Sequence, residues 1–274
     1  MQDFLALATG YREWPRHFEY AAGLSSLCAG SLTGLFVSEP IVPLQSIDTP
    51  LAFPEMYTIT ADLTRQAREA EASFLSWAAA SGARQPHWLV AEGSLSPALA
   101  HAGNWHDLLF VESGGDSPLA NVGSLGQILL TCGLPCIVVP QSANAKPRFD
   151  TVVVAWKGTA ESVRAVHAAL PLLRRARRIV LVHGEPKESY SSVDWTPQFD
   201  IDAWFARHEL KIDGRTFQSD GEEAGAGLLL NAYEAGADLL VMGAYGRSRF
   251  SEWILGGATR HVLQHARLPL FLRH

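Results

Sequence analysis

Short runs of apolar residues alternate along the chain with longer segments whose apolar positions recur every three or four residues. The apolar runs are predicted strands, at residues 4–9, 32–38, 87–92, 107–112, 136–140, 151–156, 178–184, 214–219, 238–243 and 268–274. The amphipathic segments are predicted helices, near residues 12–29, 56–81, 96–103, 124–132, 160–176, 191–210, 222–236 and 258–266. Buried strands that alternate with helices are typical of a parallel sheet covered on both faces, so the pattern predicts an α/β fold.

The two halves of the chain repeat each other. An Asp-Leu-Leu strand begins at Asp107 in the first half and at Asp238 in the second, and a last strand follows Pro135 and Pro269. The aspartate and the proline are 28 residues apart in the first half and 31 in the second. A repeat of this length indicates a duplicated domain rather than a solenoid. Because the polar stretch 140–150 is bracketed by prolines, we expect a linker there, with domains at 1–142 and 148–274.

A glycine-rich segment follows the fourth predicted strand of the second half. Gly243 and Gly246 lie three residues apart, nine residues follow, and Gly256 and Gly257 precede a predicted helix. Ligands of parallel α/β sheets bind beyond the carboxyl ends of the strands, and free N–H groups at a helix N-terminus attract anions. The glycines therefore indicate either a phosphate site or a tight connection between strand and helix, and both interpretations stay open.

On these residues the second half resembles a universal stress protein domain, and the whole chain resembles a tandem member of that family. Nucleotide-binding members carry G-x-x-G, nine residues and then G-[ST], and Gly243, Gly246 and Gly256 match this spacing. Gly257 stands where the family has Ser or Thr, and Lys157 stands where it often has an acid that contacts the adenine side of bound ATP. The resemblance covers residues 150–274 and extends more weakly to the first half.

The resemblance implies two tandem Rossmann-like domains of the HUP (adenine-nucleotide α-hydrolase-like) type, each a five-stranded parallel sheet in the order 3-2-1-4-5 flanked by helices. It implies ATP or another adenine nucleotide as the ligand of the second domain only. The phosphates are expected over the amides of Gly246 and Gly257, with the base toward Lys157. The nucleotide-binding residues that it assigns are Lys157, Gly158, Val182, His183, Met242, Gly243, Gly246, Arg247, Gly256, Gly257, Ala258 and Thr259.

The first half lacks this arrangement. Glu112 occupies the position that corresponds to Gly243, and only seven residues separate Gly115 from Gly123. Asp116 lies in this loop, where its carboxylate would repel a phosphate. The Gly-Ser pair at Gly123 is better explained as the start of a helix than as a ligand site. We therefore expect the first domain to be a degenerate copy that serves structure or partner contacts.

Composition narrows the alternatives. The 274 residues are 47% hydrophobic and 18% charged, which fits globular domains with substantial cores. A net charge of −6 gives no general attraction to nucleic acid or anionic membranes, the apolar runs are too short to span a bilayer, and no signal peptide is evident, so neither partner is expected. Three cysteines, Cys28, Cys132 and Cys136, indicate reduced thiols and a cytoplasmic location. Cys132 and Cys136 do not have the spacing of a C-x-x-C redox site, and buried structural cysteines are the favoured interpretation.

Two classes of function remain open. The histidines show no metal-ligand spacing and no G-x-S-x-G elbow exists, so no catalytic or metal-binding residue is named and we do not expect an enzyme. One class is a stress-response or signalling protein that binds nucleotide in its second domain, and the other is a scaffold of the same fold without nucleotide. The similar closing strands, 136–140 and 268–274, are expected to pair as an intramolecular pseudo-dimer, and a homodimer stays open.

Overall fold

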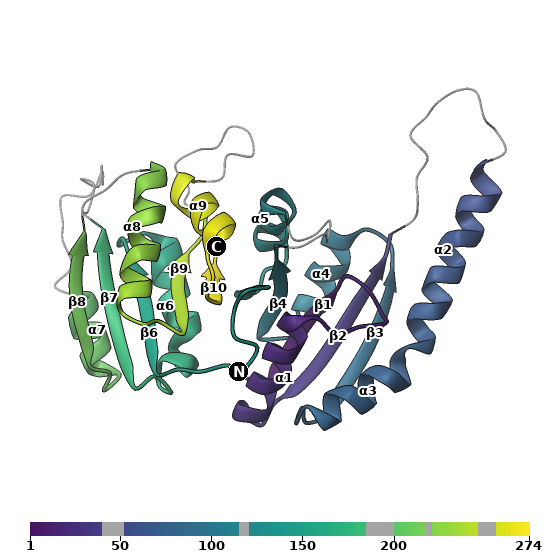
Figure 1. Cartoon of the computed structure of the whole chain (residues 1–274), viewed down its shortest axis with the longest axis horizontal. Coiled ribbons are helices and arrows are strands. Elements are labelled where there is room, and N and C mark those ends of the chain that lie inside the picture. Colours follow the sequence, from purple (N-terminus) through teal and green to yellow (C-terminus); the bar gives the residue numbers. More distant parts are fainter. Residues whose placement is uncertain (40–51, 115–120, 185–199, 218–220, 246–255) are drawn as a thin grey trace. The chain divides into compact units, whose positions relative to one another are not determined.

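The computed structural model of the chain describes residues 1–39, 52–114, 121–184, 200–217, 221–245 and 256–274, and the statements below concern these residues. The chain divides into two compact units, Met1–Lys146 and Pro147–His274. The division falls inside the polar stretch 140–150 that the sequence marks as a linker. Each unit is an α/β structure with its own sheet and its own helices (Figure 1).

The first unit contains five parallel strands in the order β3-β2-β1-β4-β5. Its elements in chain order are β1 (Asp3–Ala8), α1 (Arg16–Cys28), β2 (Ser31–Ser38), α2 (Ala52–Glu69), α3 (Glu71–Ala80), β3 (Pro86–Glu92), α4 (Leu95–Gly103), β4 (Leu108–Ser113), α5 (Val122–Thr131) and β5 (Cys136–Pro140).

The second unit repeats the arrangement, with parallel strands in the order β8-β7-β6-β9-β10. Its elements are β6 (Thr151–Trp156), α6 (Ala160–Leu173), β7 (Arg178–Gly184), α7 (Ile201–Arg207), β8 (Ile212–Phe217), α8 (Gly221–Glu234), β9 (Leu239–Gly243), α9 (Gly257–His265) and β10 (Leu270–Arg273). The predicted fold class and the strand order 3-2-1-4-5 are confirmed in both units.

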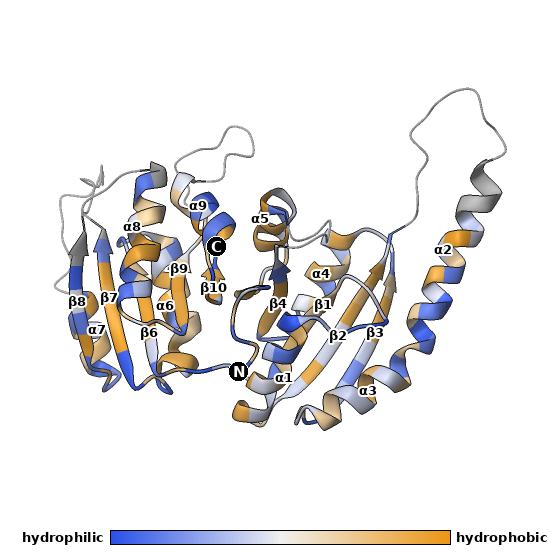
Figure 2. Ribbon diagram, viewed as in Figure 1, coloured by the Kyte–Doolittle hydropathy of each residue, from blue (hydrophilic) through white to orange (hydrophobic). Residues whose placement is uncertain are grey.

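Helices cover both faces of each sheet. Right-handed crossovers place α1, α2 and α3 on one face of the first sheet and α4 and α5 on the other. In the second unit, α6 packs on β9 and β10, whereas α8 packs against α9. The central strands are the most apolar segments (Figure 2), because they are buried between these two layers.

Two hydrogen bonds explain why the repeat is visible in the sequence. The carboxylate of Asp107 accepts from the backbone N–H of Asp3 at the start of β1, at 3.3 Å, and that of Asp238 accepts from the N–H of Thr151 at the start of β6, at 3.0 Å. The carbonyls of the two prolines before the last strands likewise accept from Leu109 and Leu240. The repeated residues thus align the strand starts in each sheet.

An aromatic cluster fills the first unit between β3 and the helices on that face. The ring of Trp14 contacts those of Phe74, Trp77 and Trp88, with centroid separations of 5.0, 5.8 and 5.2 Å. A Cβ at Gly34 would lie 2.6 Å from the ring of Trp88, so only glycine fits there. The cluster therefore constrains both α3 and the connection that carries Trp14.

Some helix boundaries differ from those predicted. The single helix expected near 56–81 is two helices, α2 and α3, which meet at Ala70. The helix expected near 12–29 begins at Arg16, because Pro15 has extended backbone angles, φ −68° and ψ 175°, at the N-cap. Within the expected helix at 191–210, α7 occupies Ile201–Arg207, and residues 185–199 lie outside the described part of the chain.

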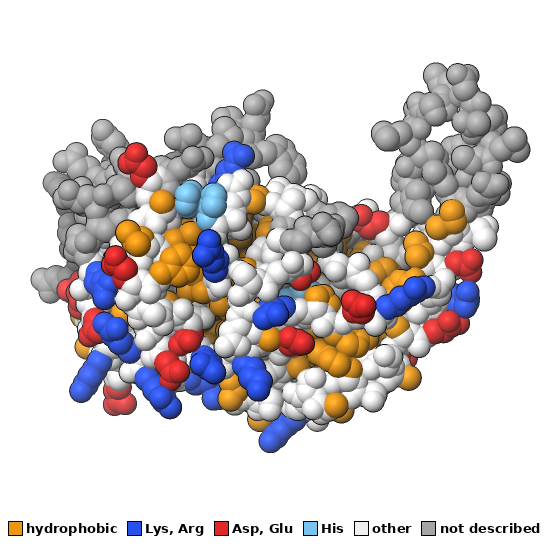
Figure 3. Space-filling view, viewed as in Figure 1, with side chains coloured by type: hydrophobic (Ala, Val, Ile, Leu, Met, Phe, Trp, Pro, Cys, Tyr) orange, Lys and Arg blue, Asp and Glu red, His pale blue; other side chains and the backbone are white. Residues whose placement is uncertain are grey.

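Charges of both signs are interspersed over the described residues on the face shown in Figure 3. Two arginines that follow α6 form ion pairs with acidic side chains: Arg177 pairs with Asp150 at 3.0 Å, and Arg178 pairs with Asp213 at 2.7 Å. No helix in the described ranges is both long enough and apolar enough to cross a membrane.

Candidate functional site

The ends of neighbouring strands bring predicted site residues to one edge of the second unit. β6 and β7 stay in register up to Trp156 and His183, and β9 ends at Gly243 beside Arg273 of β10. Because all these strands are parallel, their carboxyl ends share one edge of the sheet. The predicted residues on or directly after these strand ends are Lys157, Gly158, Val182, His183, Met242 and Gly243.

The turn between β6 and α6 is organised by its own residues. Gly158 has φ +70°, a backbone conformation that favours glycine. Thr159 is the N-cap of α6, and its hydroxyl accepts a long hydrogen bond, 3.4 Å, from the N–H of Ser162. Lys157 is exposed at the strand end. The predicted Lys-Gly-Thr segment therefore starts a helix and leaves one cation at the edge.

Gly243 is a glycine because α6 lies against the end of β9. A Cβ at this position would stand 2.6 Å from the carbonyl carbon of Glu161 and 2.6 Å from the nitrogen of Ser162. Such distances are too short for any side chain, so the close approach of strand and helix requires glycine. For this first glycine of the motif, the packing interpretation is sufficient.

Gly256 has no such reason within the described residues. Its backbone angles, φ −56° and ψ 132°, suit any residue, and a Cβ there would meet nothing within 4 Å. It is the N-cap of α9 and gives this helix no side-chain cap. Gly257, Ala258 and Thr259 form the first turn of α9, and the first N–H groups of an α-helix have no partner within the helix itself.

Other predicted residues fall differently. Thr259 is buried in the first turn of α9, with 6% of its surface exposed. Val182 and Met242 are buried strand residues, and His183 is half-buried at the end of β7. Gly246 and Arg247 lie outside the described residues.

The corresponding edge of the first unit carries different groups. Strand register pairs Leu108 with Phe4 and Leu239 with Val152, which makes Glu112 the counterpart of Gly243. Glu112 is buried, with 8% of its surface exposed, and this burial raises the pKa of its carboxyl above the usual value. The counterpart of the glycine is thus an acidic side chain, as the sequence indicated, whereas Gly115 and Asp116 lie outside the described residues.

The helix after that strand is also closed by its own cap. Asn121 is the N-cap of α5, and its side-chain oxygen accepts from the N–H of Ser124 at 3.0 Å. Gly123 and Ser124 belong to the first turn of α5, in agreement with the predicted helix start. The N-terminus of α5 is therefore partly satisfied by the chain, whereas that of α9 has no side-chain cap.

The connection between β1 and α1 is longer than the corresponding connection of the second unit, and its side chains cover part of the sheet edge. Residues 9–15 join β1 to α1, whereas residues 157–159 suffice between β6 and α6. The ring of Tyr11 packs edge-on against Phe36, with centroids 5.4 Å apart, and its hydroxyl donates to Oε1 of Gln66 at 3.0 Å. Side chains of the first unit thus cover the ends of its own β1 and β2.

Sequence reasoning missed two residues near the end of β9. Glu161 is buried, with 4% of its surface exposed, and its Oε1 has no hydrogen-bond partner among the residues that the structure describes. The buried hydroxyl of Tyr245 also lacks a partner, its φ is +59°, and burial raises the pKa of this phenol. The available signal was periodicity, since Glu161 belongs to the same helical stripe as buried Ala165 and Ala169.

Other chemistry on the described residues is limited. No group of three or more His, Cys, Asp or Glu side chains there could hold a metal ion. Cys132 and Cys136 are both buried, their Sγ atoms are 3.4 Å apart, and both thiols donate to the carbonyl of Leu134. This is the buried environment that the sequence predicted for the pair.

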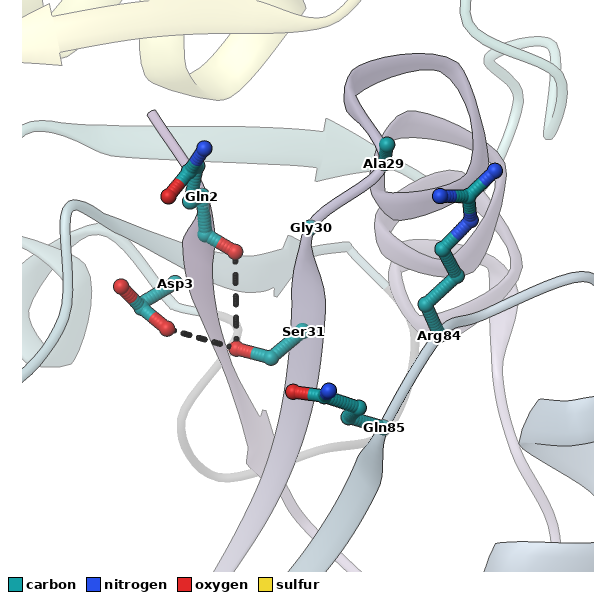
Figure 4. Close-up of a pocket in the computed structure, with 7 residues that line it drawn as sticks. All are labelled: Gln2, Asp3, Ala29, Gly30, Ser31, Arg84 and Gln85. Carbon is teal, nitrogen blue, oxygen red and sulfur yellow. Dashed lines mark hydrogen bonds between the residues drawn. The ribbon is translucent and has the colours of Figure 1, made fainter.

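A pocket of about 220 Å³ lies at the opposite, amino edge of the first sheet (Figure 4). The hydroxyl of Ser31 donates to Oδ1 of Asp3 at 2.8 Å, so the only carboxylate of its lining already has a partner. The pocket belongs to the first unit and lies at strand starts, whereas the candidate site is formed by strand ends of the second unit. Its lining residues are Gln2, Asp3, Ala29, Gly30, Ser31, Arg84 and Gln85.

The second unit has the parallel sheet order expected from the sequence, with a helix that begins at Gly257 after the end of β9. Residues 148–272 match the model of the Universal stress protein family. The resemblance found in the sequence is confirmed for this unit.

The whole chain is also similar to solved structures, over nearly the full length of each protein. A universal stress protein from Archaeoglobus fulgidus DSM 4304 has a TM-score of 0.65 at 16% identity, covering 99% of this chain and 96% of that one. A functionally unknown protein from Pseudomonas aeruginosa PAO1 has a TM-score of 0.61 at 11% identity, covering 100% of this chain and 92% of that one. A putative universal stress protein from Pseudomonas aeruginosa UCBPP-PA14 has a TM-score of 0.60 at 15% identity, covering 100% of this chain and 93% of that one. At these identities the likeness is one of fold, and no curated protein matches the chain.

Proposed function

We propose that this stress-response protein binds ATP or another adenine nucleotide in its second unit only. The site lies at the carboxyl ends of β6, β7 and β9 and at the N-terminus of α9. The match of residues 148–272 to the Universal stress protein family supports the assignment to the stress response. The glycine spacing and the geometry at α9 support the nucleotide.

The observation that carries the proposal is the contrast between α9 and its counterpart α5. The start of α9 has a glycine N-cap with open space where a Cβ would stand, whereas Asn121 caps α5 with its own side chain. An uncapped helix N-terminus presents N–H groups and the positive end of the helix dipole to an anion. Glycine is well tolerated at an N-cap, and without a side chain it leaves the helix start open to an approaching anion.

The residues present fit a phosphate better than they fit the rest of the family's nucleotide contacts. Gly256, Gly257 and Ala258 offer backbone amides with little side-chain obstruction. Lys157 adds a positive charge at the same edge, although the acid that usually contacts the adenine side is missing. The fit thus supports binding through the phosphates, with weaker selection for the base.

We propose binding without turnover, because the recognisable features of the site are backbone amides and a dipole rather than a nucleophile and a base. Incubation of the protein with ATP should then release no phosphate above the rate of a heat-denatured sample. All three cysteines are thiols, which supports our proposal that the protein works in a reducing compartment, the cytoplasm.

Mass spectrometry of the supernatant from denatured, freshly purified protein tests the nucleotide directly. We expect ATP, ADP or AMP in an amount that follows the protein concentration, and none after Gly256→Val, because a β-branched side chain would fill the open space above the amides. A wild-type protein that carries no nucleotide and takes up none would favour the scaffold interpretation instead.

A further inference from the structure

Glu161 of α6 lies beside the end of β9, and its buried carboxylate takes no part in the nucleotide contacts proposed above. Its side chain is 4% exposed, and Oε1 makes no hydrogen bond. A buried acceptor without a partner costs roughly 1–3 kcal/mol, and more when it is charged, so native structures seldom keep one without a reason. A water, a ligand or an ion is the usual reason.

The position of Glu161 relates this carboxylate to the candidate site. It is the second residue of α6, after Thr159 at the N-cap, and its Cβ would be 2.8 Å from a Cβ at Gly243. Side chains of a helix lean toward its N-terminus, and the N-terminus of α6 lies at the carboxyl edge of the sheet. The carboxylate therefore extends toward the strand end from which the glycine loop departs.

The first unit also has a buried acid at the carboxyl edge of its sheet, although at a different position, since Glu112 is the counterpart of Gly243. Its buried acid, Glu112, accepts a hydrogen bond from the side chain of Gln141. Glu161 has no equivalent donor, and no ion pair involves it among the described residues. Glu112 of the first unit thus has a hydrogen-bond partner within the chain, whereas Glu161 of the second unit still needs a positive or hydrogen-bonding partner.

A phosphate at the start of α9 and a carboxylate at the end of β9 would repel each other across the edge. We propose that Glu161 holds a divalent cation, such as Mg²⁺, between its carboxylate and the phosphates of the bound nucleotide. This inference rests on the proposed function. Mg²⁺ is commonly bound by one or two carboxylates together with substrate phosphates and water, so a single protein ligand is enough. The cation satisfies the buried oxygen and removes the repulsion.

The test is a comparison of ATP affinity with Mg²⁺ and with EDTA, by calorimetry on the full chain. Wild type should lose affinity by about tenfold or more without Mg²⁺, as expected for a charge-assisted contact. Glu161→Gln keeps the shape of the side chain and should show much less dependence on Mg²⁺. For each protein, the affinity for ATP in Mg²⁺ is divided by the affinity in EDTA. Mg²⁺ changes free ATP equally in both experiments, so a difference between the two ratios is due to Glu161.

Asp202→Asn is the matched control, because Asp202 is also the second residue of a helix in this unit but is exposed. It should behave like wild type. Mn²⁺ measured by electron paramagnetic resonance gives a second test on unmodified protein: ATP and protein together should immobilise more Mn²⁺ than ATP alone.

The outcomes are distinct. Equal dependence on Mg²⁺ in wild type and Glu161→Gln, or an equal loss of affinity for this variant in Mg²⁺ and in EDTA, would overturn the cation while leaving nucleotide binding intact. Failure of wild type to bind ATP under both conditions would overturn the proposed function and the cation together.

Discussion

The glycines of the second unit's edge serve different physical needs. Gly158 provides a positive φ of +70°, and Gly243 allows the backbone of α6 to approach within 2.6 Å of where a Cβ would be. Gly256 is required by neither condition. The sequence marks Gly243 and Gly256 by their spacing and Gly158 by the family resemblance. It cannot separate the reasons for the three glycines, because they depend on the local backbone conformation and on what another segment places beside each glycine.

This difference gives a prediction for alanine at two positions. Gly256→Ala should leave the free energy of unfolding within about 0.5 kcal/mol of wild type and weaken nucleotide binding. Gly158→Ala should cost about 1 kcal/mol, because alanine is disfavoured at positive φ. Urea unfolding and calorimetry measure the two effects separately. If Gly256→Ala bound nucleotide as tightly as wild type, the open space at α9 would not be a phosphate site.

A buried histidine makes the stability of the first unit depend on pH. The ring Nε2 of His17 lies 2.8 Å from the carbonyl of Leu7, and burial lowers the pKa of this imidazole from 6.5 to about 4. The unfolded chain therefore binds a proton before the folded one does. Stability should be complete above pH 6.5 and fall by about 3 kcal/mol as the pH falls toward 4.

Urea unfolding between pH 7 and pH 4 measures this loss. His17→Gln should be less stable at pH 7 yet show a smaller loss on acidification, because its side chain does not titrate. His87→Gln, on an exposed residue of β3, is the control and should follow wild type. An unchanged pH dependence in His17→Gln would assign the effect to other groups.

Whole elements are predicted best where one local pattern decides them. Most strands of both units follow from continuous apolar runs, and α6 and α9 begin within one residue of the predicted positions. The exception is β8 (IDGRTF), which mixes apolar and polar residues and begins at Ile212, two residues before the predicted strand 214–219. The break between α2 and α3 does not follow from local sequence, because Ala70 itself keeps helical angles, φ −73° and ψ −8°. We attribute the separate course of α3 to packing of Phe74 and Trp77 against Trp14, a contact between distant segments.

The start of β6 offers a prediction at the same scale. Asp238→Ala removes the acceptor of the Thr151 N–H, 3.0 Å away, and should lower the free energy of unfolding by about 1–2 kcal/mol. Asp150→Ala removes the neighbouring ion pair with Arg177, in which both side chains are largely exposed, and should cost less than about 0.5 kcal/mol. Equal losses in the two variants, measured by urea unfolding, would show that the repeated aspartate does not anchor the strand.

The molecule as a whole combines two copies of one fold with different edges. The repeat of Asp-Leu-Leu and Leu-Pro segments predicts the duplication, because these residues form the same backbone hydrogen bonds in each unit. The sequence also predicts that the first edge is degenerate, from Glu112. The sequence could not predict that Tyr11 covers this edge or that the buried carboxylate of Glu161 lacks a hydrogen-bond partner among the described residues. Both features depend on contacts between elements far apart in the chain.

Our proposal gives the chain one nucleotide site, in the second unit. Calorimetric titration of the full chain with ATP in the presence of Mg²⁺ counts the sites. We predict one ATP bound per chain, no binding in Gly256→Val, and unchanged binding in Asn121→Ala, which alters the corresponding helix start of the first unit. Two sites per chain, a single site that survives Gly256→Val, or no binding by the wild-type protein would contradict the account.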